Sequence, residues 1–115
     1  MQKFPRRWDS ITKINFLQRK IILNSIAYYE FDKSYISDSE FDELSHQLVE
    51  MQKSIPNIQD TEYGYMMYDF DGSTGFDLFG RLNEKDKEYL LDITKRHIDK
   101  EKQKEKPKKK GGRLF

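Results

Sequence analysis

The chain has 115 residues and no cysteine, which predicts one domain and excludes a disulfide framework and thiolate metal sites. No apolar run approaches the roughly 18 residues that a membrane-spanning helix needs, and the first residues lack the apolar core of a signal peptide, so we expect a cytoplasmic protein without membrane contact. The net charge is −6 over residues 1–94 and +7 from Lys95 onward, which predicts a folded domain over residues 1–99 and a flexible basic tail over residues 100–115.

The first predicted helix begins at Asp9 or Ser10, either of which can cap it. Its apolar residues form one stripe that then widens, which predicts a helix covered on more than one side. The residues of this stripe are Ile11, Ile14, Phe16, Leu17, Ile21, Leu23, Ile26 and Tyr28. A lone tryptophan usually packs against a core, so we expect the same of Trp8.

A second helix is predicted from about Asp38 to Lys53, because its first residues carry clear start signals. Ser37 and Glu40 have the spacing of a capping box, and Ile36 and Phe41 have that of a hydrophobic staple. Pro56 ends the helical region, since proline disfavours helix in the residue before it. The two helices form a helix–loop–helix elbow and favour a small, mainly α-helical fold.

Asp38 and Asp42 are four residues apart, so both carboxylates lie on one face of the second helix. They could simply complement the positive helix N-terminus and meet solvent. They could instead accept hydrogen bonds from hydroxyl or amide groups of a ligand, with Tyr28 and Tyr29 as a stacking wall. We expect no metal site, because no further ligand has a helpful spacing.

The middle of the chain gives weaker signals. Residues 63–70 are rich in aromatic side chains and could form a short strand or a segment packed over the two helices. Residues 71–75 (Asp-Gly-Ser-Thr-Gly) are turn-like, and Ser73 is placed to cap a short helix. Asn83 is placed to cap a last helix from about Glu84.

Asp69 and Asp71 resemble the nucleophile strand of haloacid-dehalogenase-type phosphatases, but the 44 residues that follow are too few for the sheet of such an enzyme. A turn whose carboxylates accept hydrogen bonds from backbone amides explains the segment as well. We therefore retain Asp69 and Asp71 as candidate partner-binding residues only.

The elbow resembles the small N-terminal helical domain of bacterial NAD-dependent DNA ligases over residues 10–53. The resemblance is carried by Tyr28-Tyr29 and by the run Asp38-Ser-Glu-Phe-Asp42, where that family has an aromatic or histidine pair and an Asp-x-Glu-Tyr-Asp run. It implies that Tyr28, Tyr29, Asp38 and Asp42 contact the nicotinamide mononucleotide (NMN) half of a bound NAD or NMN. Phe41 stands at the family's tyrosine, so one hydroxyl contact is missing.

Nucleotidyl transfer in that family needs a lysine nucleophile in a Lys-x-Asp-Gly motif. The segment most similar to this motif is Asp69-Phe-Asp71-Gly72, which has Asp69 at the position of the lysine. The large nucleotidyltransferase domain of the family is also absent from these residues, so we expect no enzymatic activity. The whole chain also resembles small ligase-related proteins from phage genomes. That resemblance does not settle the role of the chain; in a phage setting, a nucleotide-binding module of this kind could act as a regulatory or anti-defence protein in the host cytoplasm.

Two alternatives to nucleotide binding remain open. The elbow could bind and inhibit or recruit a host protein. The basic tail could bind nucleic acid with a strong dependence on salt, although a solvated tail explains its composition too. Leu114 and Phe115 end the chain and resemble tails that dock on the bacterial sliding clamp, without the glutamine that such motifs favour.

Overall fold

The computed structural model describes residues 2–73 and 75–104, which form helices joined by loops. The helices are α1 (Ser10–Phe31), α2 (Asp38–Lys53), the 3-10 helix η1 (Ile58–Asp60), α3 (Gly64–Met67), α4 (Leu78–Arg81) and α5 (Glu84–Lys104). No strand occurs in these residues, which confirms the predicted helical fold class. The strand alternative for residues 63–70 is wrong, because this segment contains α3.

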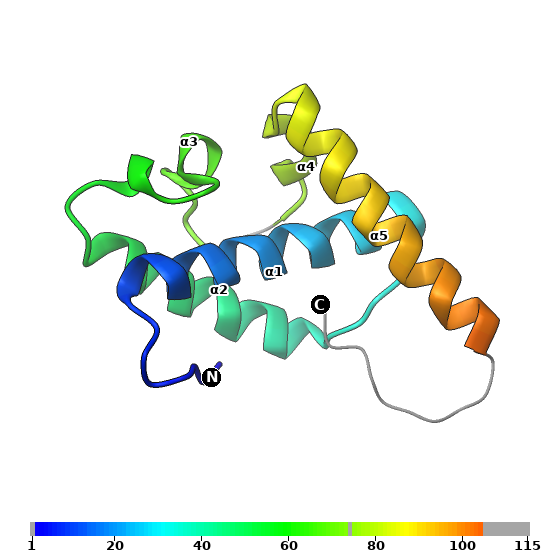
Figure 1. Ribbon diagram of the computed structural model, residues 1–115, viewed down its shortest axis with the longest axis horizontal. Helices are drawn as coiled ribbons and strands as arrows, with labels where there is room; N and C mark the ends of the chain where they lie inside the picture. The colour runs from blue at the N-terminus through cyan, green and yellow to red at the C-terminus, as the bar shows by residue number, and fades with distance from the viewer. Residues whose placement is uncertain (1, 74, 105–115) are drawn as a thin grey trace.

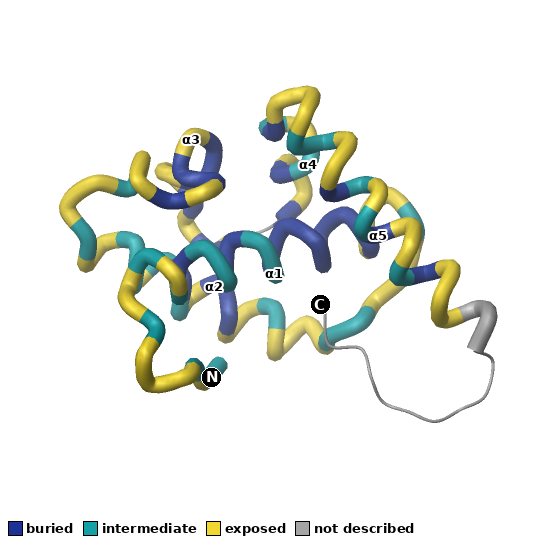
Figure 2. The backbone as a smooth tube through the Cα atoms, viewed as in Figure 1, coloured by how far each residue is buried: buried dark blue, intermediate teal, exposed yellow. Residues whose placement is uncertain are grey.

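Helix α1 lies in the middle of the molecule, with α2 along one side and α3, α4 and α5 on the other (Figure 1). Its residues 21–27 are all buried. Seven successive residues span almost two helical turns, so α1 is covered in every direction at this level. Figure 2 shows this buried stretch along α1. The predicted widening of the apolar stripe is thereby confirmed.

Both ends of α1 are fixed by hydrogen bonds that satisfy backbone groups of the helix. Asp9 caps the first turn, because its Oδ1 accepts from Thr12 N at 2.9 Å. At the other end Asp32 adopts the left-handed conformation with φ 56°, and the backbone N–H of Lys33 donates to Ala27 O at 2.9 Å. The left-handed residue ends the helix and turns the chain into the elbow.

Gln18 is a fully buried polar residue that joins three segments. Its Nε2 donates to Gln52 Oε1 of α2 at 2.9 Å and to Thr61 Oγ1 at 3.0 Å. Its Oε1 accepts from Tyr63 N at 3.0 Å. One side chain therefore holds α2 and the segment that follows η1 against α1.

The elbow begins α2 as the sequence predicts. Ser37 Oγ accepts from Glu40 N at 3.0 Å, and the helix has the predicted bounds. The elbow is also attached to α5, because Tyr35 donates from its hydroxyl to Glu101 Oε1 at 2.9 Å and meets the His97 ring edge-on at 4.8 Å. These contacts join the loop between α1 and α2 to α5.

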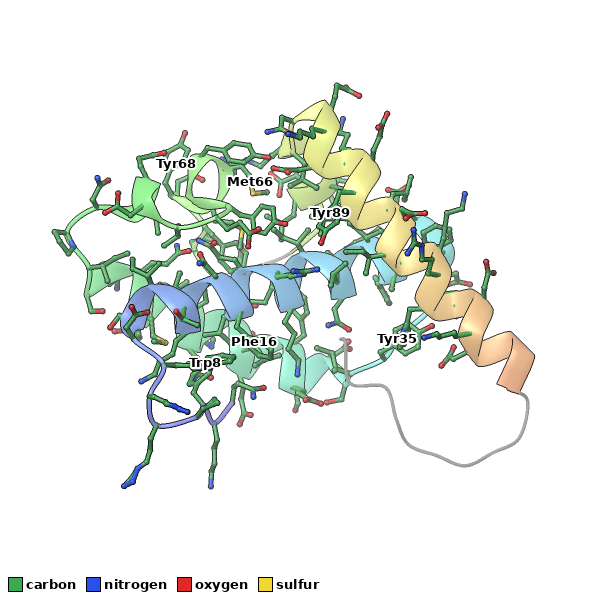
Figure 3. The ribbon with its side chains drawn as sticks, in the orientation of Figure 1. Trp8, Phe16, Tyr35, Met66, Tyr68 and Tyr89 are labelled. Carbon is green, nitrogen blue, oxygen red and sulfur yellow. The ribbon has the colours of Figure 1, made fainter. Side chains whose placement is uncertain are left out.

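The N-terminal segment packs on the opposite end of α1. Trp8 lies 5.7 Å from Phe16 and 5.9 Å from Phe4, measured between ring centroids. Figure 3 shows Trp8 and Phe16 together on this side of the molecule. The expected packing of Trp8 is confirmed.

The turn at residues 69–77 differs from expectation in its capping. Ser73 does not cap a helix; its backbone N–H and hydroxyl donate to Asp71 Oδ1 at 3.0 and 2.7 Å. Asp77, and not Ser73, precedes α4. Asn83 caps α5 as predicted, with its Oδ1 accepting from Asp86 N at 2.8 Å.

The segment then crosses close to α1 at Gly75. A Cβ built on Gly75 would overlap Ser25 Oγ and lie 3.1 Å from Phe41 Cζ. Only a residue without a side chain can approach both helices this closely. Gly75 therefore places the turn against α1 and the start of α2.

Helix α5 continues to Lys104, so residues 100–104, which we assigned to the basic tail, extend this helix. The predicted domain boundary at residue 99 stays a prediction, and Leu114 and Phe115 lie outside the described residues. Among the described helices, none is both long and apolar enough to span a bilayer.

We predict that Gln18→Met lowers the free energy of unfolding by about 1–3 kcal/mol, because it leaves the buried N–H of Tyr63 without its acceptor. Urea denaturation measures this loss. Gln59→Met, at an exposed glutamine, is the control and should change stability little. Equal effects of the two substitutions would contradict the role given to Gln18.

We further predict that Gly75→Ala lowers the free energy of unfolding by about 1–3 kcal/mol, because its methyl group overpacks the contact with Ser25 and Phe41. Gly80→Ala is the matched control, since a Cβ at Gly80 meets nothing within 4 Å. Thermal unfolding of both variants tests this, and a stable Gly75→Ala protein would show that the close approach is not required.

Candidate ligand pocket

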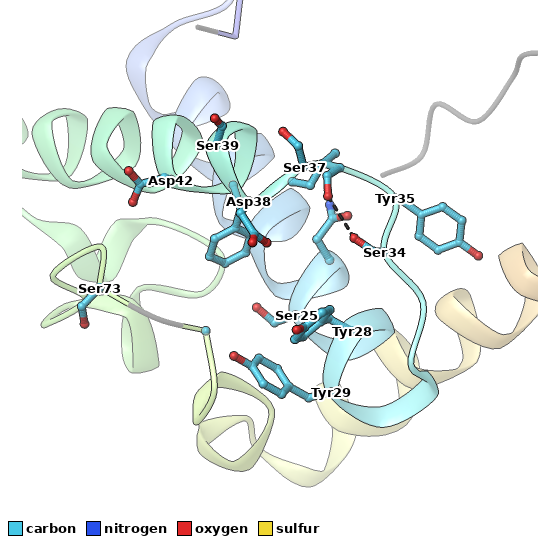
Figure 4. A pocket seen from close by; sticks show the side chains of 14 residues that line it. Ser25, Tyr28, Tyr29, Ser34, Tyr35, Ser37, Asp38, Ser39, Asp42 and Ser73 are labelled. Carbon is cyan, nitrogen blue, oxygen red and sulfur yellow. Dashed lines mark hydrogen bonds between the residues drawn. The ribbon is translucent and has the colours of Figure 1, made fainter.

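A pocket of about 480 Å³ opens where four segments meet: the end of α1, the elbow, the first turns of α2 and the turn before α4. Figure 4 shows the side chains around it. Its lining consists of Asn24, Ser25, Tyr28, Tyr29, Ser34, Tyr35, Ile36, Ser37, Asp38, Ser39, Phe41, Asp42, Ser73 and Gly75. All five nucleotide-binding candidates of the sequence analysis are among these residues.

Tyr28 and Tyr29 form an aromatic wall at the end of α1. They directly follow the buried stretch of this helix and are 51% and 44% exposed. Their rings are perpendicular, with centroids 4.8 Å apart. Tyr29 also meets the exposed ring of Phe76 edge-on at 5.4 Å, so the wall continues into the turn before α4. Perpendicular rings present both a face and an edge to an adjacent group.

The two carboxylates of α2 lie at different places in the pocket. In Figure 4 Asp38 points into the space between α2 and the two tyrosines, whereas Asp42 points to one side, away from them. Asp42 Oδ2 lies 3.8 Å from His46 Nδ1 of the next turn, and both side chains are largely exposed. The structure therefore brings Asp38 closest to the aromatic wall and places Asp42 toward the edge.

Phe41 contributes an apolar surface to the pocket. Its ring is partly buried against the core and touches the position of Gly75. An aromatic ring without a hydroxyl suits this position, because a buried hydroxyl would need a hydrogen-bond partner.

Sequence reasoning missed the polar residues that α1 contributes. Asn24 is 5% exposed; its Nδ2 donates to Lys20 O at 2.8 Å, while its Oδ1 has no hydrogen-bond partner among the described residues. Ser25 is also buried, and its hydroxyl donates to Ile21 O at 3.0 Å. The polar pair interrupts an otherwise apolar run, Ile21–Leu23 and Ile26–Ala27, which is the one signal that could have marked it in the sequence.

Tyr35 borders the pocket but points away from it, toward α5 (Figure 4). Burial and its hydrogen bond to Glu101 raise the pKa of the Tyr35 hydroxyl. On the same side of α5, burial lowers the pKa of the His97 imidazole. Both groups therefore remain uncharged near neutral pH and serve to attach the elbow.

Asp69 and Asp71 are not among the residues that line the pocket. Asp69 forms an ion pair with Arg81 at 2.7 Å, and Asp71 accepts from Ser73 within its own turn. Partner binding by Asp69 and Asp71 stays a prediction. In the part of the chain that the structure describes, no cluster of three or more metal-ligating side chains occurs.

A comparison with protein families finds one match. The model described as the DNA ligase-like, N-terminal NAD+-binding domain matches residues 9–63, slightly less than half of the chain. The matched residues include α1, the elbow and α2, and with them Tyr28, Tyr29, Asp38, Phe41 and Asp42. Searches of curated proteins and of solved structures gave no match. The part of the chain that forms the elbow and most of the pocket thus resembles the NAD+-binding N-terminal domain of DNA ligase-like proteins.

Proposed function

We propose that the chain is a non-catalytic module that binds the nicotinamide half of NAD+ or free NMN in this pocket. One observation carries the proposal: the residues implied as nicotinamide contacts line a single pocket. Its volume of about 480 Å³ falls within the range of about 300–1,000 Å³ that is usual for small-molecule sites.

Each element of the pocket suits a part of this ligand. The nicotinamide ring of NAD+ is a flat cation, which is attracted to the face of an aromatic ring such as Tyr28 or Tyr29. The carboxamide N–H and the ribose hydroxyls are hydrogen-bond donors, and the carboxylate of Asp38 can accept hydrogen bonds from them. Such charge-assisted hydrogen bonds are roughly twice as strong as neutral ones. Asp42, at the edge, reaches a more exposed part of the ligand.

The pocket is suited to holding the nucleotide and not to transferring it. Nucleotidyl transfer in the ligase family uses a lysine amine. None of the described lining residues is a lysine. Retention without transfer would let the protein sequester or sense the nucleotide, as a phage regulatory or anti-defence protein could do in its host.

A protein-interaction function is the second candidate, and the exposed aromatic side chains favour it. Phe76 is 70% exposed and continues the surface of Tyr28 and Tyr29. Contiguous exposed aromatic surface often marks a contact with another protein. The same rings would then bind a host protein in place of a nucleotide.

Isothermal titration calorimetry with NAD+ and NMN separates the two functions. We expect binding by the full chain, and at least roughly tenfold weaker binding by Tyr28→Ala and by Asp38→Asn, since each removes an interaction worth on the order of 1.4 kcal/mol or more. The controls are Tyr68→Ala and Glu50→Gln, which change an exposed tyrosine and an exposed acid of α2 outside the pocket. An absence of binding to the unchanged protein would reject the nucleotide and favour the interaction module.

A further inference from the structure

The charge of the pocket lining restricts which part of a nucleotide can enter. The described lining contains two carboxylates, Asp38 and Asp42, and no lysine, arginine or histidine. A phosphate group usually binds to arginine, lysine or the free amides of a helix N-terminus. Only the last of these is present here, at the start of α2.

The N-terminus of α2 is a poor phosphate site in this protein. A helix N-terminus acts like about half a positive charge. Asp38 and Glu40 already stand in this first turn, and Ser37 occupies the amide of Glu40. The negative charges of Asp38 and Glu40 outweigh the half positive charge of the helix N-terminus, so this end of the pocket repels an anion.

The neutral polar groups of the wall are mostly hydroxyls, which can donate or accept, and they add no positive charge. The hydroxyls of Ser25 and Ser34 donate to Ile21 O and Ile36 O, both at 3.0 Å, which leaves their lone pairs for other groups. One of the two N–H donors of Asn24 Nδ2 is used by Lys20 O. Its buried Oδ1 has no partner among the described residues, a state that costs about as much as a lost hydrogen bond.

A pocket that is lined by two carboxylates and by no basic side chain among the described residues matches a cationic ligand whose donors can reach the carboxylate oxygens. We propose that the pocket selects the nicotinamide riboside part of the nucleotide by charge: it accepts the pyridinium ring with its carboxamide and ribose hydroxyls, leaves the phosphate outside, and rejects the carboxylate analogue. This inference rests on the proposed function and names the part of the ligand that the pocket recognises.

Three ligands test the inference on the full chain by calorimetry: NMN, nicotinamide riboside and nicotinic acid riboside. Because the phosphate gains no cationic partner, we expect the phosphate to add little affinity. The dissociation constant of nicotinamide riboside should therefore be no more than about three times that of NMN. Because a carboxylate faces Asp38, we expect nicotinic acid riboside to bind at least roughly tenfold more weakly than nicotinamide riboside. Asp38→Asn should reduce this amide-to-acid ratio, and Glu50→Gln, on the same helix outside the pocket, should preserve it.

The outcomes distinguish this inference from the proposed function. Tenfold tighter binding of NMN than of the riboside, or equal binding of the amide and acid ribosides, would overturn charge selection while nucleotide binding stands. An unchanged amide-to-acid ratio in Asp38→Asn would overturn it as well. Binding of none of the three ligands would remove both the proposed function and the inference.

Discussion

The enclosure of α1 is the constraint on which the rest of the structure depends. Residues 21–27 are buried in every direction, so this helix cannot rotate or slide without exposing core side chains. Tyr28 and Tyr29 follow immediately and leave the core at a fixed place. The left-handed Asp32 then turns the chain into the elbow, Tyr35 attaches the elbow to α5, and Gln18 holds α2 against α1. A pocket formed between two such elements is largely preformed, which lowers the entropy lost when a ligand binds.

Part of the pocket comes from outside the residues that resemble the ligase domain. The family match ends at residue 63, whereas Ser73 and Gly75 line the pocket and Phe76 extends its aromatic wall. The close approach of Gly75 to the side chains of Ser25 and Phe41 packs this part of the turn against both helices. The chain thus forms one side of the pocket from residues beyond the family match, and the other side from residues that resemble the NAD+-binding domain of DNA ligase-like proteins.

Helix bounds that depend on capping residues and on proline could be predicted from the sequence. The bounds of α2 follow from the cap at Ser37 and the proline at residue 56, and Asn83 marks the start of α5.

The strand alternative for residues 63–70 failed because aromatic content favours strands on average, while tertiary packing decided this segment. A Cβ at Gly64 would overlap Ile58 O, so the missing side chain lets the start of α3 pack directly against η1. The cap predicted at Ser73 failed because α4 begins only at Leu78, and the Ser73 hydroxyl instead donates to Asp71 within the turn. The roles of Gln18, Asn24 and Gly75 depend on residues distant in sequence, so local patterns could not reveal them.

The central claim is that the end of α1, the start of α2 and the turn before α4 form one ligand site. Titration of the isotopically labelled full chain with NMN, followed by amide correlation NMR, tests it most directly. The account predicts that the largest chemical-shift changes fall on residues 24–42 and 73–76, with α3 and the first turns of α5 unaffected. A spectrum that does not change at millimolar NMN, or changes centred on α3 and α5, would contradict the account.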